Sequence, residues 1–205
     1  GIAHHDAFSV KLDAPPGSVV VAPWGNRYFA LAYAQRVEGR FPAWTIVDHR
    51  ADIPQLAHGA GGVFYTADET LYILDGRWWR ARLGESLHIS SAGPDMLALA
   101  GRPLALATEL GQPLGDGIAL VRWEIHRPAP ERMRVVLWWT ATQPPSQSYS
   151  TYVHVTDRDE IGAPEDLIGQ SDASAAVYGR YPVTEWQIGE LVREDHEIAL
   201  AAGRV

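Results

Sequence analysis

Residues 18–48 decide the expected fold of the first half of the chain, and they read SVVVAPWGNRYFALAYAQRVEGRFPAWTIVD. Ser18–Ala22 is a short β-branched run, which predicts a buried strand. The alanine-rich run 26–38 has helical spacing and is followed by Gly39, a typical residue after a helix C-terminus. Trp44–Asp48 is a second β-branched run. Strand, helix and strand in this order predict a parallel pair joined by a right-handed crossover.

The same alternation continues beyond residue 50. Asp52 is expected to cap a short helix over residues 53–58, and Val63–Thr66 is expected to form a third strand. Glu85–Ser90 alternates and is expected to be a fourth strand. We therefore predict that residues 1–100 form an α/β domain with a small parallel sheet.

The second half follows a different pattern. Helical periodicity disappears near residue 101, and short alternating runs recur at intervals of roughly ten residues. These runs are Ile118–His126, Arg134–Thr142, Ser150–Thr156, Leu167–Ser171 and Val192–Leu200. Short strands with turn residues between them favour an antiparallel arrangement. We therefore predict that residues 101–205 form an antiparallel β-sandwich that resembles a jelly roll.

The composition argues against several classes of function. The chain has 205 residues, no cysteine and a formal net charge of −8. The acidic balance argues against a nucleic-acid partner, because such binding needs clustered Lys and Arg. The absence of cysteine removes thiol nucleophiles, iron–sulfur clusters and zinc ribbons from consideration. No run approaches the ~18 apolar residues of a membrane span, and no basic-then-apolar leader opens the sequence.

Polar and aromatic residues follow the first two predicted strands. The phosphate-loop and dinucleotide motifs are absent there, and the chain has no Gly-x-Ser-x-Gly elbow. Because ligands gather outside the carboxyl ends of parallel strands, these residues are expected to share one rim. The candidate ligand-binding residues are Trp24, Asn26, Arg27, Asp48, His49 and Arg50, with Asp68 beside them. They form either a polar pocket for a charged or sugar ligand, or a loop whose charges are solvated or paired with each other.

Two short stretches carry residue types that bind metals in other proteins. His4-His5-Asp6 lies near the start of the sequence, and Asp157, Asp159 and Glu160 crowd one loop. Neither stretch has the spacing of an established metal site. We therefore predict no metal and no cofactor.

One part of the second half is distinctive. It contains YSTYVHVTD at residues 149–157, QSD at 170–172, YGRYPVTEW at 178–186 and GELVR at 189–193. This pattern resembles the carboxy-terminal soluble region of bacterial polytopic membrane glycosyltransferases, in the superfamily of protein mannosyltransferases and aminoarabinose transferases. The sequence departs from the family pattern at Val183, which interrupts a Pro-Thr pair. Residues 15–100 are loosely similar to the segment that follows the last membrane helix of such proteins.

The matched residues have expected structural roles. They are Tyr152, His154, Asp172, Tyr181, Pro182 and Trp186. Tyr181 and Trp186 are expected to be buried at a corner that Pro182 stiffens, because proline fixes its own φ and restricts the residue before it. Asp172 is expected to cap a turn through its side chain. The family's acceptor-side acidic residues belong to loops of the membrane portion, so the resemblance carries no catalytic residue over to this chain.

The resemblance implies a soluble part of a membrane enzyme. We therefore expect a noncatalytic extracytoplasmic accessory region, tethered through its parent chain, that recognises a sugar or an acceptor. Its expected partners are the membrane portion of the same chain and carbohydrate. One alternative is an autonomous carbohydrate-binding module, which the eight tryptophans suit. The other is a small-molecule enzyme built on the α/β half, which lacks a convincing carboxylate pair or a nucleophile with a placed base.

Overall fold

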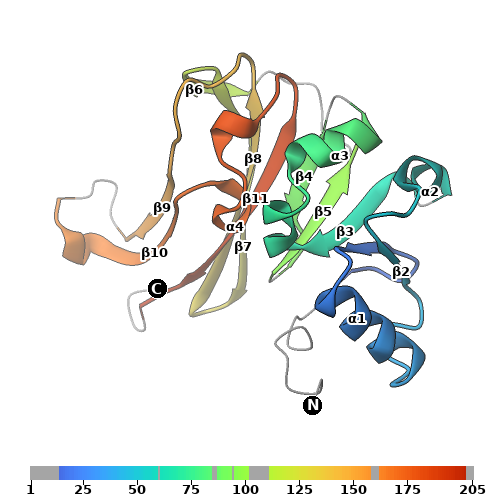
Figure 1. The fold of residues 1–205 in the computed structure, drawn as a ribbon. Helices are drawn as coiled ribbons and strands as arrows, with labels where there is room; N and C mark the ends of the chain where they lie inside the picture. Colours follow the sequence, from blue (N-terminus) through green and yellow to red (C-terminus); the bar gives the residue numbers. More distant parts are fainter. Residues whose placement is uncertain are drawn as a thin grey trace. The chain divides into compact units, whose positions relative to one another are not determined.

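The computed structural model describes residues 14–59, 61–84, 87–93, 95–101, 111–157 and 162–201. The chain divides into two compact units, residues 1–106 (unit 1) and residues 107–205 (unit 2). Figure 1 shows the helices and strands of both units, which make the protein mixed α/β. None of the helices in the described ranges is long and apolar enough to cross a membrane.

Unit 1 follows the predicted alternation of strands and helices. Its elements are β1 (Val19–Ala22), α1 (Asn26–Arg36), β2 (Thr45–Asp48), α2 (Ile53–Gly59), β3 (Val63–Ala67), the 3₁₀ turn η3 (Asp68–Tyr72), α3 (Gly76–Leu83), β4 (His88–Ser91) and β5 (Met96–Ala100). The expected cap at the start of α2 is confirmed, because the Gln55 amide donates to Asp52 Oδ1 at 3.1 Å. The three strands and two helices at residues 18–67 therefore lie where the local sequence places them.

The sheet of unit 1 is mixed, so the predicted parallel half is not confirmed. β1 pairs in parallel with both β2 and β3, whereas β5 runs antiparallel to β3 and to β4. The strand order within this unit is β2-β1-β3-β5-β4. The connection 92–95 between β4 and β5 is too short for a crossover helix, and only an antiparallel pair fits such a turn. The apolar run Met96–Ala100 was not expected as a strand, yet it lies centrally and is buried throughout.

The core of unit 1 lies between the sheet and its helices. Val20, Ala22, Leu31 and Met96 form one buried cluster, with Ala14 at its edge. Phe64 and Trp79 are also fully buried, and their rings lie 6.2 Å apart. This packing fixes the carboxyl ends of β1, β2 and β3, where the candidate rim begins.

Unit 2 contains the five strands that the second-half pattern predicts, with β6 in addition. Its elements are β6 (Gln112–Gly115), β7 (Ile118–Ala129), β8 (Arg132–Ala141), β9 (Thr151–Thr156), the 3₁₀ turn η4 (Pro164–Asp166), β10 (Leu167–Ala173), α4 (Ala176–Gly179), the 3₁₀ turn η5 (Val183–Glu185) and β11 (Leu191–Ala199). Within this unit β11, β8, β7 and β6 pair side by side in antiparallel order. β9 and β10 form a separate antiparallel ribbon.

The ribbon lies on one face of the four-stranded sheet. Val153 and Val155 of β9 pack against a buried cluster that includes Leu137 of β8 and Ile198 of β11. Gly169 of β10 permits this close approach, because an added Cβ would lie 2.7 Å from Ile198 Cγ2. A complete jelly-roll sandwich is not confirmed, since residues 174–190 between β10 and β11 form turns instead of further strands.

Candidate functional site

The structure brings four of the six candidate rim residues together after β1 and β2. The Trp24 amide donates to His49 Nδ1 at 3.0 Å, and the Arg50 guanidinium lies 3.8 Å from the centroid of the Trp24 ring. Arg50 Nη2 also donates to Asp48 Oδ2 at 2.9 Å, and this contact lowers the pKa of the Asp48 carboxyl. These polar groups are therefore bonded to one another.

The other two rim residues lie apart from that cluster. Arg27 forms an ion pair with Glu69 and is attracted by the charges of Asp68 and Asp95. Burial lowers the pKa of the Arg27 guanidinium, and the two aspartates oppose that shift. Asn26 is the first residue of α1, whose N-terminus has no side-chain cap. The six residues consequently form two paired groups and a helix start.

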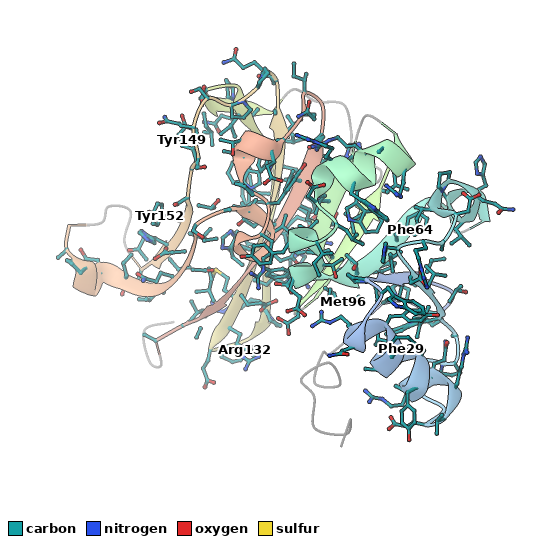
Figure 2. All side chains as sticks on the ribbon, in the orientation of Figure 1. Phe29, Phe64, Met96, Arg132, Tyr149 and Tyr152 are labelled. Carbon is teal, nitrogen blue, oxygen red and sulfur yellow. The ribbon has the colours of Figure 1, made fainter. Side chains whose placement is uncertain are left out.

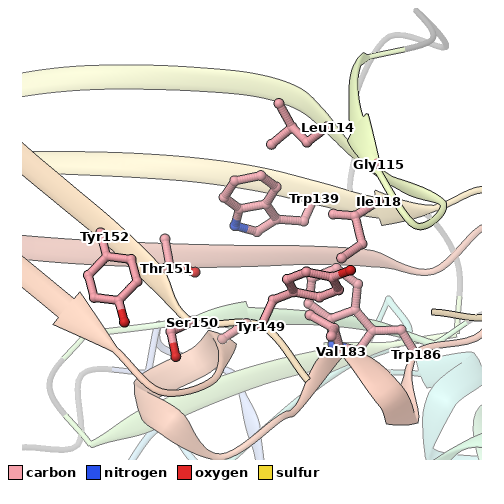
Figure 3. A pocket seen from close by; sticks show the side chains of 11 residues that line it. Leu114, Gly115, Ile118, Trp139, Tyr149, Ser150, Thr151, Tyr152, Val183 and Trp186 are labelled. Atoms are coloured by element: carbon pink, nitrogen blue, oxygen red, sulfur yellow. The ribbon is translucent and has the colours of Figure 1, made fainter. Parts of the chain in front are cut away.

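Unit 2 contains a pocket that the sequence did not indicate. Its volume is about 260 Å³, and Figure 3 shows the side chains around it. It is lined by Leu114, Gly115, Ile118, Trp139, Tyr149, Ser150, Thr151, Tyr152, Ala176, Val183 and Trp186. Most of the lining is apolar or aromatic, and two hydroxyl-bearing side chains lie beside the aromatic rings. Figure 2 places Tyr149 and Tyr152 on the same stretch of chain that enters β9.

The turn between β6 and β7 fixes one wall of this pocket. Gly115, Asp116 and Gly117 all have positive φ, at 119°, 45° and 73°. This backbone suits glycine and is tolerated by aspartate. Asp116 Oδ2 accepts hydrogen bonds from the Ser146 amide at 2.7 Å and from the Tyr149 hydroxyl at 3.2 Å. The bonds from Ser146 do most to lower the pKa of Asp116, and the carboxylate holds the loop that carries Tyr149.

The buried carboxylate of Glu194 bonds to two of the residues that line the pocket. Glu194 is 2% exposed, and its Oε2 accepts from Trp139 Nε1 at 3.1 Å and from Thr151 Oγ1 at 3.2 Å. Glu194 Oε1 has no hydrogen-bond partner within the described residues. Behind it, His196 Nδ1 lies 3.0 Å from Ser171 Oγ. The indole and hydroxyl that bond to Glu194 come from β8 and β9, so this residue links the sheet to the ribbon.

The expected burial of Tyr181 and Trp186 is confirmed. Both side chains are buried, and Trp186 Nε1 donates to the Tyr181 carbonyl at 3.2 Å. The Tyr181 hydroxyl donates to Glu190 Oε2 at 2.7 Å, and the Gln187 amide donates to the same oxygen at 3.0 Å. Pro182 lies within this corner, as expected. The corner holds the Trp186 ring as a second aromatic wall of the pocket.

The other matched residues lie on the β9–β10 ribbon. Tyr152 is 66% exposed and lines the pocket. Asp172 was expected to cap a turn, but it lies within β10, opposite Tyr152 in the register. Its Oδ1 lies 3.5 Å from His154 Nε2 across the ribbon. Tyr152 and His154 alternate along β9 and share one face, where their ring centroids lie 6.2 Å apart.

The backbone beside the pocket is strained. Val177 and Tyr178 of α4 have φ of 56° and 58°, although neither is glycine. A β-branched residue at positive φ is costly and is retained only where its surroundings enforce it. Val177 is fully buried next to the pocket residue Ala176, so the packing of unit 2 holds this conformation.

Three of the aromatic residues that line the pocket, Trp139, Tyr149 and Trp186, have polar atoms that are already bonded to the protein. Among the described residues no group of three or more His, Asp or Glu is arranged to hold a metal ion. His4-His5-Asp6, Asp159 and Glu160 lie outside the described residues. The geometry therefore favours binding of a ring with apolar faces and polar edges.

The sequence contained one usable signal for this pocket. The adjacent pair Trp138-Trp139 in an alternating run predicts that one ring faces a core, and in β8 it is Trp139 that packs against the ribbon. Trp138 lies on the other face of the sheet, with the guanidinium of Arg122 5.2 Å from its ring centroid and that of Arg193 at 5.6 Å. Tyr149 had no such signal, because Asp116 positions it from 33 residues away in the sequence.

Comparison of the chain with family models, with curated proteins and with solved structures finds no match.

Proposed function

We propose that the chain is a noncatalytic carbohydrate-recognition region, and that the pocket of unit 2 takes one sugar ring. The observation that carries this proposal is the combination of aromatic walls and hydroxyls in one preformed pocket. Sugar rings present C–H groups on their faces and hydroxyls at their edges. Aromatic rings pack against the first, and hydroxyl and carboxylate groups bond to the second.

The pocket walls support this assignment because they are held in place before a ligand arrives. Trp139 is bonded to Glu194, Tyr149 to Asp116 and Trp186 to the Tyr181 carbonyl. Side chains that are already ordered lose little conformational entropy on binding, which favours affinity. The Trp139 and Tyr149 rings are partly exposed and available to a ligand while their polar tips stay bonded, and the buried Trp186 ring backs the pocket.

The wider context is also a proposal. We infer that the region belongs to a membrane glycosyltransferase-like protein and lies on the extracytoplasmic side, beside the membrane portion of the same parent chain. Support comes from the resembling segments 149–157 and 178–186, which together contribute six of the eleven pocket residues. In this proposal the β9–β10 ribbon and the four-stranded sheet form a reduced sandwich that presents the pocket.

The test is a titration of the purified chain with a panel of neutral mono- and disaccharides, followed by isothermal calorimetry. At least one sugar is expected to bind, and Tyr152→Ala is expected to weaken it about tenfold, because stacking on one exposed ring contributes on the order of 1 kcal/mol. Tyr72→Ala is the matched control, since Tyr72 is an exposed tyrosine of unit 1 outside the pocket.

Two results would overturn the assignment. One is the absence of binding to every sugar of the panel by a chain whose circular dichroism shows it to be folded. The other is sugar binding that Tyr152→Ala and Tyr149→Ala leave at the wild-type affinity, which would place the site elsewhere.

A further inference from the structure

The outer face of helix α1 carries large apolar side chains that nothing in the described residues covers. Phe29, Tyr33 and Val37 are 51%, 47% and 64% exposed, and their spacing of four places them on one stripe. On the opposite face Leu31 and Ala34 are buried against unit 1. A helix with apolar residues on both faces is normally covered on both, so this stripe points to a partner. Phe29 is labelled on α1 in Figure 2.

The stripe is extended by Trp24 and by arginines. Trp24 is 47% exposed, and its ring centroid lies 4.7 Å from that of Phe29. Residues 26–40 hold three arginines (Arg27, Arg36 and Arg40) and one acid (Glu38), and Glu69 pairs with Arg27, so the local net charge is +1 in a chain whose net charge is −8. Arg36 and Arg40 are exposed, and Arg40 lies 3.7 Å from Glu38.

We propose that this face of α1, formed by Phe29, Tyr33, Arg36 and Val37 with Trp24 just before the helix, docks on an anionic bilayer surface. Aromatic side chains settle at the boundary between hydrocarbon and head groups, because one end is apolar and the other polar. Arginines extend an apolar stem and keep the charged group among anionic head groups. The helix would lie in the plane of the surface with its buried face still packed on the sheet.

Size and charge favour a lipid surface over a protein partner. From Phe29 to Val37 the stripe is about 12 Å long at 1.5 Å per residue, which is short for an interface of about 800 Å² per partner. A second copy docked through the same face would bring the exposed arginines of the two copies together. A bilayer surface needs neither a large area nor shape complementarity, and its negative charge matches the local excess of arginine.

The test is sedimentation of the whole chain with phosphatidylcholine vesicles, with and without 30% phosphatidylglycerol. Binding is expected with the anionic vesicles and is expected to fall in high salt, since the attraction of arginines is screened. Phe29→Ser and Val37→Ser are each expected to weaken the partition, the former about tenfold. Arg36→Gln is expected to weaken binding to anionic vesicles only. Ile73→Ser is the matched control, because Ile73 is an exposed apolar residue of unit 1 that does not belong to α1.

Three outcomes contradict the proposal. The folded chain could fail to sediment with either vesicle, or Phe29→Ser could bind as tightly as Ile73→Ser. The chain could also form dimers in analytical ultracentrifugation that Phe29→Ser abolishes, which would make a second copy the occupant. None of these outcomes depends on the sugar titration, because the pocket residues of unit 2 are unchanged in every variant.

Discussion

In the rim of unit 1, Trp24, Asp48, His49 and Arg50 bond to one another, and Arg27 bonds to Glu69. In the pocket of unit 2, by contrast, Trp139, Tyr149 and Trp186 bond through their polar tips to a buried carboxylate, a turn aspartate and a backbone carbonyl. In both regions the named side chains therefore bond to other groups of the protein. The difference is that aromatic side chains of unit 2 surround a cavity, whereas the rim residues contact one another.

The comparison teaches that polar residues at strand ends are poor evidence for a site on their own. A ligand must replace the bonds that such residues already make with one another, and the exchange brings little net free energy. An open aromatic face has no protein bond to lose, because its interactions with water are weak. The pocket is consequently the better candidate, although its residues are less conspicuous in the sequence.

The largest expected difference between the two regions is in stability. Trp186→Ala should lower the free energy of unfolding by about 3–5 kcal/mol, because it removes a ring that is fully buried in the corner of unit 2. Trp24→Ala should cost about 1 kcal/mol or less, since that ring is half exposed. Urea unfolding of the two variants measures both quantities. Equal losses would contradict the assignment of Trp186 to the core.

The next effect concerns the carboxylate under the pocket. Glu194→Ala leaves the Trp139 indole and the Thr151 hydroxyl without their acceptor, and each lost partner costs about 1–3 kcal/mol. The variant should also bind sugar more weakly, because Trp139 loses its anchor. At the rim, Arg50→Ala should change the free energy of unfolding by less than about 1 kcal/mol, as is usual for an exposed ion pair. If the two variants have the same unfolding midpoint, Glu194 does not hold the pocket.

A smaller effect should appear in acid. The pKa of Asp116 is lower in the folded chain than its usual value. Above about pH 4 the ionised carboxylate therefore accepts bonds from Ser146 and Tyr149 and stabilises their loop. That contribution is lost as the pH falls through the folded pKa. The amide signals of residues 146–149 should therefore shift in acid in the wild-type chain. Asp116→Asn keeps an acceptor oxygen without a charge, so the shift should be absent. Identical pH profiles for the two proteins would refute the role of Asp116.

The last prediction concerns catalytic activity: neither region is expected to hydrolyse or transfer a sugar. Glycoside hydrolysis uses two carboxyl groups about 5–9.5 Å apart, one with a raised pKa. Neither Asp48 nor Asp116 meets that requirement, because the pKa of each is lowered. Incubation of the chain with activated and polymeric sugars should release no product. Turnover that is abolished by replacing one carboxylate would contradict the noncatalytic assignment.

Sequence reasoning placed local elements well and long-range pairing less well. The strands at 19–22, 45–48 and 63–67 and the helix at 26–36 follow from residue propensity and spacing, which act over a few residues. The strand at Met96–Ala100 was not predicted, and its antiparallel pairing with β3 makes the sheet of unit 1 mixed, because a short apolar run does not reveal which neighbour it pairs with. The pocket also escaped notice, since its walls come from five separate segments between residues 114 and 186 that only tertiary packing joins.

The account's central claim is that unit 2, and not the rim of unit 1, recognises sugar. Indole N–H signals of the chain labelled with ¹⁵N-tryptophan test it most directly, with assignments made by single Trp→Phe variants. Addition of a bound sugar should shift the signals of Trp139 and Trp186 and leave that of Trp24 unchanged. A shift of Trp24 with Trp139 and Trp186 unmoved would contradict the account and would return the site to the rim.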